Sequence, residues 1–103
     1  MIGGLYTVLK QDSEQVTIQL TTENYSIFQA HFPDRPILPG FALIDIISEV
    51  LNDTVVYIRY SKFIAHLLPN DIILCKIKTD KNRRSIKIFK NTQKVGEITY
   101  ESK

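Results

Sequence analysis

The stretch Ala30–Leu51, AHFPDRPILPGFALIDIISEVL, determines the predicted fold of this 103-residue chain. Its first half contains Pro33, Pro36 and Pro39. Each proline fixes its own φ and pushes the residue before it toward extended backbone. From about Gly40 onward, apolar residues fall on nearly every side of a helix, which is typical of a helix buried in a core. The stretch therefore predicts a stiff loop that leads into a buried helix ending near Leu51.

Two ionisable side chains stand out within this stretch. Asp45 is placed in the apolar helix, and His31 stands at the head of the loop. A buried ionisable group is costly unless it is paired or takes part in chemistry. The start of the helix at Gly40 adds free backbone N–H donors and the positive end of the helix dipole. His31, Asp45 and Gly40 are therefore the candidate functional residues.

The rest of the chain has the pattern of β-strands. Strands are predicted over residues 5–10, 15–21, 54–64, 72–79, 85–90 and 94–101. Polar turns separate most of them, and Val16, Ile18 and Leu20 alternate with polar residues as on a half-buried strand. A helix that is apolar on nearly all sides needs cover, which a twisted antiparallel sheet gives by curling around it. The prediction is one α+β domain over residues 1–103, with one long apolar helix wrapped by about six strands.

Composition and charge are those of an ordinary globular protein. The chain is 44% hydrophobic and 23% charged, with a net charge of +2, which gives no reason to expect nucleic-acid or membrane binding. The single cysteine, Cys75, excludes an intramolecular disulfide, so we expect a buried thiol and a reducing, cytoplasmic compartment. The N-terminus does not resemble a signal peptide, and no apolar run reaches the ~20 residues that cross a bilayer.

The proline-rich loop and the helix also carry a resemblance to a known family. The chain is similar to the hotdog-fold 3-hydroxyacyl-acyl carrier protein dehydratases. Their pattern is H-F-P-G-x-P-x-x-P-G, with an acidic residue fourteen positions after the histidine. The matching residues are His31, Phe32, Pro33, Pro36, Pro39, Gly40 and Asp45. The chain looks most like the compact dehydratases of aryl-polyene or polyketide-type pathways.

This resemblance implies dehydration of 3-hydroxyacyl thioesters to trans-2-enoyl thioesters in fatty-acid or polyketide-like synthesis. His31 suits the base that removes a proton from C2, because histidine exchanges protons near neutral pH. Asp45 suits the acid that protonates the leaving hydroxyl, since a carboxyl group in an apolar environment tends to keep its proton. The Gly40 N–H suits the thioester oxygen. The implied substrate is linked to 4′-phosphopantetheine on acyl carrier protein, with no cofactor or metal.

The resemblance also implies an assembly. His31 of one subunit would face Asp45 of the other, so the site is expected only in a homodimer or a higher assembly of dimers. An unpaired sheet edge gives a separate reason for two copies to pair. The candidates to line an acyl tunnel are Phe32, Phe41, Leu43 and Ile44.

Several residues leave alternatives open. Glu49, one turn after Asp45, either modulates the acid or points to solvent. Ala30 and Asp34 stand where the family usually has glycine, and His66 lies outside the motif, where a surface or packing role is favoured. Six basic residues have two interpretations: a basic surface for an acidic carrier protein, or simply a solvated strand face. They are Arg59, Lys62, Lys76, Lys78, Arg83 and Arg84.

Two other functions compete with dehydration: a hotdog acyl thioesterase and a non-catalytic module that binds acyl thioesters. The proline-rich H-F-P loop argues against the first. The presence of both His31 and Asp45 argues against the second, because binding alone needs neither. Acyl chain length, carrier protein versus coenzyme A, and isomerase activity are left open by the sequence.

Overall fold

A computed structural model describes residues 6–21 and 37–103 of the chain. Within these residues two strands precede a helix and four strands follow it. The elements are β1 (Tyr6–Gln11), β2 (Gln15–Leu20), α2 (Gly40–Val50), β3 (Val55–Phe63), β4 (Ile72–Asp80), β5 (Arg83–Lys90) and β6 (Gln93–Ser102). The predicted order is confirmed, and each predicted boundary lies within about two residues of the observed one.

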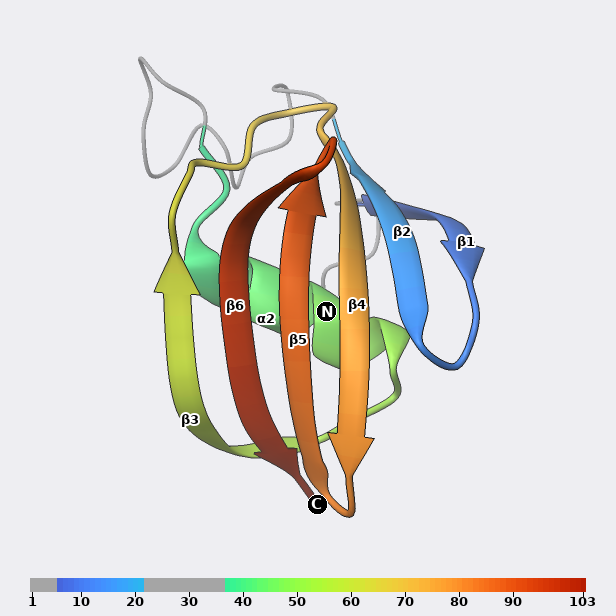
Figure 1. Cartoon of the computed structure of the whole chain (residues 1–103), viewed down its shortest axis with the longest axis vertical. Helices are drawn as coiled ribbons and strands as arrows, with labels where there is room; N and C mark the ends of the chain where they lie inside the picture. Colours follow the sequence, from blue (N-terminus) through green and yellow to red (C-terminus); the bar gives the residue numbers. More distant parts are fainter. Residues whose placement is uncertain (1–5, 22–36) are drawn as a thin grey trace.

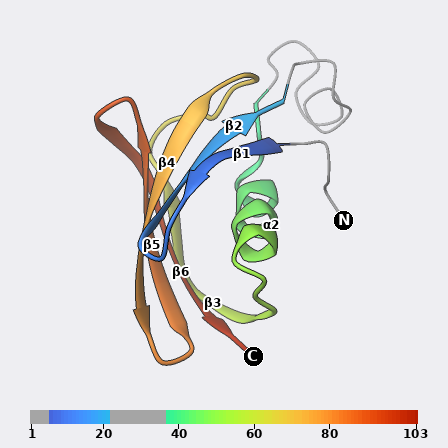
Figure 2. The same cartoon turned by 90° about the vertical axis from the view of Figure 1, so that its right-hand side faces the viewer.

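The six strands form one antiparallel sheet in the order β1-β2-β4-β5-β6-β3. The sheet curls around α2 without closing, so β1 and β3 are its two edges (Figure 1). Figure 2 shows α2 lying against the concave side of this curved sheet. The predicted α+β arrangement of a helix wrapped by about six strands is therefore confirmed.

The core lies between α2 and the inward residues of the strands. Helix residues Ala42, Leu43, Ile44, Ile46 and Ile47 are buried. They share one hydrophobic cluster with the strand residues Val16, Ile18, Leu20, Ile73, Cys75, Ile77, Ile86, Ile88, Val95, Ile98 and Tyr100. The alternation seen in the sequence thus marks the inner face of the sheet, and the prediction of a buried Cys75 thiol is confirmed.

One face of α2 departs from the prediction. Phe41, Asp45 and Glu49 are exposed, and Phe41 keeps 56% of its surface accessible. Because they are spaced by four residues, they form a single stripe along the helix. The sequence predicted an Asp45 buried in an apolar environment, which is wrong for the single chain, because no described strand covers this side of the helix (Figure 2).

A network of polar side chains fixes the end of α2 to the sheet. Asp53 accepts hydrogen bonds from Nε and Nη2 of Arg84 at 2.8 and 2.9 Å, and from the Tyr100 hydroxyl at 2.6 Å. Nη1 of Arg84 also donates to Oγ1 of Thr79 at 3.0 Å. Burial alone favours the neutral carboxyl, but the hydrogen bonds from Arg84 and Tyr100 outweigh it and lower the pKa of Asp53. The helix exit is thereby joined to β4, β5 and β6.

Within the described residues, no helix has the length and apolar character required to span a membrane. The same residues contain no group of three His, Cys, Asp or Glu side chains arranged as metal ligands would be.

Candidate functional site

The site predicted from the sequence begins at the N-terminus of α2. Pro39 precedes the helix with extended backbone (φ −63°, ψ 147°), and no side chain in residues 6–21 or 37–103 caps this end. The first turn closes through the Ala42 N–H, which donates to the Pro39 carbonyl at 3.0 Å. The helix therefore presents the positive end of its dipole without a side-chain acceptor of its own, as a site for a developing negative charge requires.

A cavity of about 200 Å³ lies directly beside this helix start. It is lined by Ile37, Leu38, Pro39, Gly40, Phe63, Ala65, His66 and Leu67. One wall is held by a bridge between two separate segments, in which the Leu38 N–H donates to the Leu67 carbonyl at 2.8 Å. The cavity thus combines apolar walls with Gly40, at the place where the sequence predicts the thioester group.

The ring of Phe63 occupies space that two glycines leave open. A Cβ placed on Gly40 would lie 2.5 Å from Cε2 of Phe63, and one on Gly96 would lie 3.1 Å from Cδ1 of the same ring. Any side chain at position 40 would therefore crowd this ring. The structure adds a packing reason for glycine here, while the role of the Gly40 N–H toward the thioester oxygen stays a prediction.

The exposed stripe of α2 is tied to the edge strand β1. The Tyr6 hydroxyl donates to Oε1 of Glu49 at 2.7 Å. Burial of Tyr6, together with this bond and the negative charge of Glu49, raises the pKa of Tyr6 to about 12. Glu49 is thus exposed but hydrogen-bonded, one turn from Asp45, and whether it modulates the acid stays a prediction.

The structure separates the other predicted residues. Leu43 and Ile44 face the sheet in the packed core, whereas Phe41 lies on the opposite, exposed side of the helix. A tunnel through one chain that all three line is therefore not supported. The remaining predicted residues, His31, Phe32, Ala30 and Asp34, lie outside the described residues, and their roles stay predictions.

Two side chains near the site were missed in the sequence, and a third was treated as peripheral. Tyr6 and Glu49 are 43 positions apart in the sequence, so no local sequence pattern predicts their contact. Phe63 lies at the end of β3, and the strand pattern did not predict its contact with Gly40. His66, expected to have a surface or packing role, is exposed and also lines the cavity at the helix start.

The predicted basic surface is smaller than the sequence suggested. Arg84 is partly buried in its contact with Asp53. Arg59 and Arg83 both contact Oε2 of Glu101, at 2.8 and 3.5 Å. Three of the six basic residues named from the sequence are therefore already ion-paired within the chain.

Comparison with known proteins assigns the family. A family model described as ApeI dehydratase, of the ApeI-like family, matches residues 8–102. The chain belongs to the ApeI-like dehydratase family. Among curated relatives, a 3-hydroxyacyl-[acyl-carrier-protein] dehydratase FabZ from Caldanaerobacter subterraneus subsp. tengcongensis is 28% identical, covering 86% of this chain and 72% of its own. A FabZ from Rickettsia canadensis is 31% identical, covering 84% of this chain and 71% of its own.

Solved structures show the fold of this ApeI-like chain. The dehydratase heterocomplex ApeI:P from Xenorhabdus doucetiae matches with a TM-score of 0.80 and 23% identity, covering 94% of this chain and 96% of that one. Mouse thioesterase superfamily member 2 matches with a TM-score of 0.60 and 8% identity, covering 95% and 81%. Both confirm the predicted hotdog fold. At these sequence identities the similarity is evidence for the fold and not for the activity.

Proposed function

We propose that this ApeI-like protein dehydrates 3-hydroxyacyl thioesters carried by acyl carrier protein to trans-2-enoyl thioesters. The observation that carries the proposal is the uncapped start of α2 at Gly40, beside an apolar cavity, in a chain of a dehydratase family. The carrier-bound substrate is supported by the names of the FabZ relatives, which are dehydratases of 3-hydroxyacyl groups on acyl carrier protein.

The chemistry is an elimination that needs a base, an acid and a donor for the thioester oxygen. His31 takes the proton from C2, and the electron pair of that C–H bond forms the C2–C3 double bond. The C3 hydroxyl leaves with a proton from Asp45, as water. The Gly40 N–H holds the charge that develops on the thioester oxygen, where the helix dipole adds to the effect. Each of these groups typically contributes about a hundredfold or more in rate.

A dimer completes this proposal. Asp45 is exposed in the single chain, whereas an acid of this kind works best away from water. Among the described strands, β3 pairs with β6 on one side only, and its exposed large residues are Val56, Tyr57, Ile58 and Tyr60. A long apolar edge of this kind invites pairing with another strand. A second copy joined at β3 supplies that pairing, and in our proposal it brings its His31 to the Asp45 stripe.

A direct assay tests the proposed reaction. The protein is mixed with 3-hydroxyacyl and with saturated acyl thioesters of a carrier protein, and both enoyl absorbance and free thiol are followed. Enoyl absorbance from the 3-hydroxyacyl substrate, lost in Asp45→Asn, is the expected result. Release of free thiol would instead mark a thioesterase. No product from either substrate would mark a module that only binds acyl groups.

A further inference from the structure

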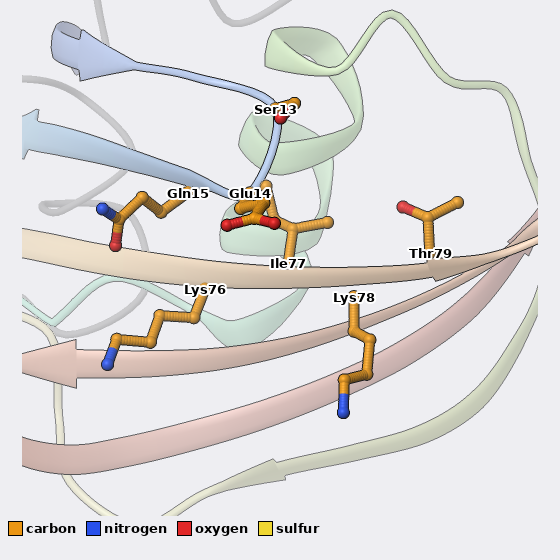
Figure 3. A pocket seen from close by; sticks show the side chains of 7 residues that line it. All are labelled: Ser13, Glu14, Gln15, Lys76, Ile77, Lys78 and Thr79. Atoms are coloured by element: carbon orange, nitrogen blue, oxygen red, sulfur yellow. The ribbon is translucent and has the colours of Figure 1, made fainter.

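A groove runs along β4 at the end of the sheet where the β1–β2 turn lies (Figure 3). Its larger part is a cavity of about 670 Å³ lined by Ser13, Glu14, Gln15, Lys76, Ile77, Lys78 and Thr79. A neighbouring hollow of about 250 Å³ is lined by Lys76, Ile77, Lys78, Ser85 and Lys87. Because both parts share residues 76–78, we treat them as one surface, the β4 groove. Figure 3 shows Lys76 and Lys78 pointing to the same side of the strand.

The lysines of this groove differ from the other basic residues of the same strands. Strands β4, β5 and β6 contain seven Lys and Arg residues. The four that pair with a carboxylate are Arg83, Arg84, Lys90 and Lys94. The other three form no salt bridge with any described residue, and they are Lys76, Lys78 and Lys87. Lys87 lies opposite Glu97 in the register of β5 and β6 and interacts with its charge, so Lys76 and Lys78 are the cations of the β4 groove with no carboxylate opposite them among the described residues.

Strand pairing places these charges close together. Lys76 stands opposite Lys87 in the register of β4 and β5, and Lys78 stands opposite Ser85. Side chains opposite each other lie ~5 Å apart at Cβ, and residues two apart on a strand lie ~6.7 Å apart. Like charges directly opposite destabilise a sheet. Nζ of Lys76 also lies 5.1 Å from the ring centroid of Phe89, which offsets part of this cost.

We propose that the β4 groove binds an acidic helix of a partner protein. Carboxylates one turn apart on a helix are separated by about 5–6 Å at Cβ, which matches the spacing of the three lysines. Within the chain, carboxylates pair with Arg83, Arg84, Lys90 and Lys94. An acidic partner would supply such counter-charges to the lysines of the β4 groove. Glu14 closes the groove at the turn, so we expect the acidic residues to lie toward Lys78 and Lys87.

The proposed surface is separate from the candidate active site. Residues 73, 75 and 77 of β4 face the core with α2, so the alternating Lys76 and Lys78 point away from the helix. A partner bound there leaves the Gly40 cavity and the Asp45 stripe open. Partner binding and dehydration are therefore independent, and each can be tested without the other.

The test uses two synthetic helical peptides of identical composition. One has glutamates aligned at every fourth position, and the other has the same glutamates distributed around the helix. The triple variant Lys76→Gln, Lys78→Gln, Lys87→Gln is compared with the matched control Lys10→Gln, Lys81→Gln, Lys103→Gln, which removes three exposed lysines elsewhere. Fluorescence anisotropy gives the affinities, and thermal unfolding shows that both variants are folded.

We expect the aligned peptide to bind more tightly than the distributed one, and the groove triple to weaken it about tenfold, as loss of three exposed ion pairs implies. The control triple should change it less than about twofold. On the wild-type protein, the aligned peptide should shift the NMR amide signals of residues 76–78 and 85–87 above all others. This second measurement needs no substitution.

Three results would overturn the proposal. Equal weakening by both triples would show a general charge effect. Equal affinity of the two peptides would show that the groove does not recognise glutamates aligned on one face of a helix. Inorganic pyrophosphate that binds the same lysines more tightly than the aligned peptide would make the groove a small-anion site instead.

Discussion

Gly40 and Phe63 are matched to one another: a Cβ on the glycine would lie 2.5 Å from Cε2 of the phenyl ring. The ring therefore lies where any larger residue at the helix start would have to go. This contact fixes the end of β3 against the first turn of α2, beside the cavity in which we place the thioester.

Gly40→Ala should lower both stability and dehydration. Overpacking of this kind costs about 1–3 kcal/mol, because the ring or the helix start has to move. Urea unfolding of Gly40→Ala and of Gly40→Ala/Phe63→Leu tests this, since the smaller leucine should return part of the lost stability. Wild-type stability in Gly40→Ala alone would show that the ring can move aside freely. Recovered stability without recovered turnover would show that the Cβ at position 40, and not the lost stability, obstructs the reaction.

Loss of Arg84 should destabilise the chain far more than loss of its neighbour Arg83. Arg84→Leu leaves the carboxylate of Asp53, whose side chain is 8% exposed, without its cation, which costs about 2–4 kcal/mol. Arg83→Leu breaks only a contact of 3.5 Å at the surface and serves as the matched control, with a cost below about 1 kcal/mol. Chemical unfolding of both variants at neutral pH gives the comparison, and similar losses would contradict it.

The same network predicts how stability depends on pH. The pKa of Asp53 is lowered in the folded chain, so its contribution is complete above the pKa of the unfolded carboxyl, about 4. That contribution is lost as the pH falls from there toward the folded pKa. The free energy of unfolding should therefore decline more steeply between about pH 5 and pH 2 in wild type than in Asp53→Asn. Parallel curves would mean that other carboxyl groups determine the decline.

The sequence predicted the elements well because their signals are local. Alternation at Val16, Ile18 and Leu20 marks an inner strand face, and Pro39-Gly40 marks the helix start. Asn52, Asn70 and Asn91 all adopt positive φ, at 57°, 67° and 60°, where asparagine is tolerated better than most residues. These positions end the helix or form turns, so the boundaries follow from the sequence.

The candidate site was less predictable because its contacts are not local. Phe41 is expected to line an acyl tunnel with Leu43 and Ile44, but the described strands cover only one side of α2, and Phe41 lies on the other side. The same one-sided cover exposes Asp45. The bonds from Tyr6 to Glu49 and from Arg84 to Asp53 join residues 43 and 31 positions apart. Only strand order brings these residues together, and strand order was not predicted.

Glu49→Gln should change the titration of Tyr6. The pKa of Tyr6 is raised to about 12 by burial first and by Glu49 second. Removing the negative charge should therefore lower the pKa while leaving it above the ordinary value of about 10. The difference between the ultraviolet titrations of wild type and Tyr6→Phe isolates this tyrosine. An unchanged pKa in Glu49→Gln would contradict the pairing.

A charge on the β3 edge should prevent dimerisation. Ile58 is 47% exposed, and Ile58→Lys places a cation on an edge that we expect to be buried between copies. Light scattering should show a monomer for this variant and a dimer for wild type, with dehydration lost in the monomer. Val8→Lys on the opposite edge, β1, is the matched control and should remain dimeric. A dimeric, active Ile58→Lys would exclude pairing through β3.

The most direct test is complementation between two inactive variants, measured as enoyl formation from a 3-hydroxyacyl thioester. His31→Ala and Asp45→Asn should each lose activity by at least about a hundredfold. If each site takes His31 from one protomer and Asp45 from its partner, a mixed dimer contains one intact site. Random exchange makes half of the dimers mixed, so the mixture should recover up to about a quarter of wild-type activity. No recovery despite demonstrated subunit exchange would contradict a site shared between two chains.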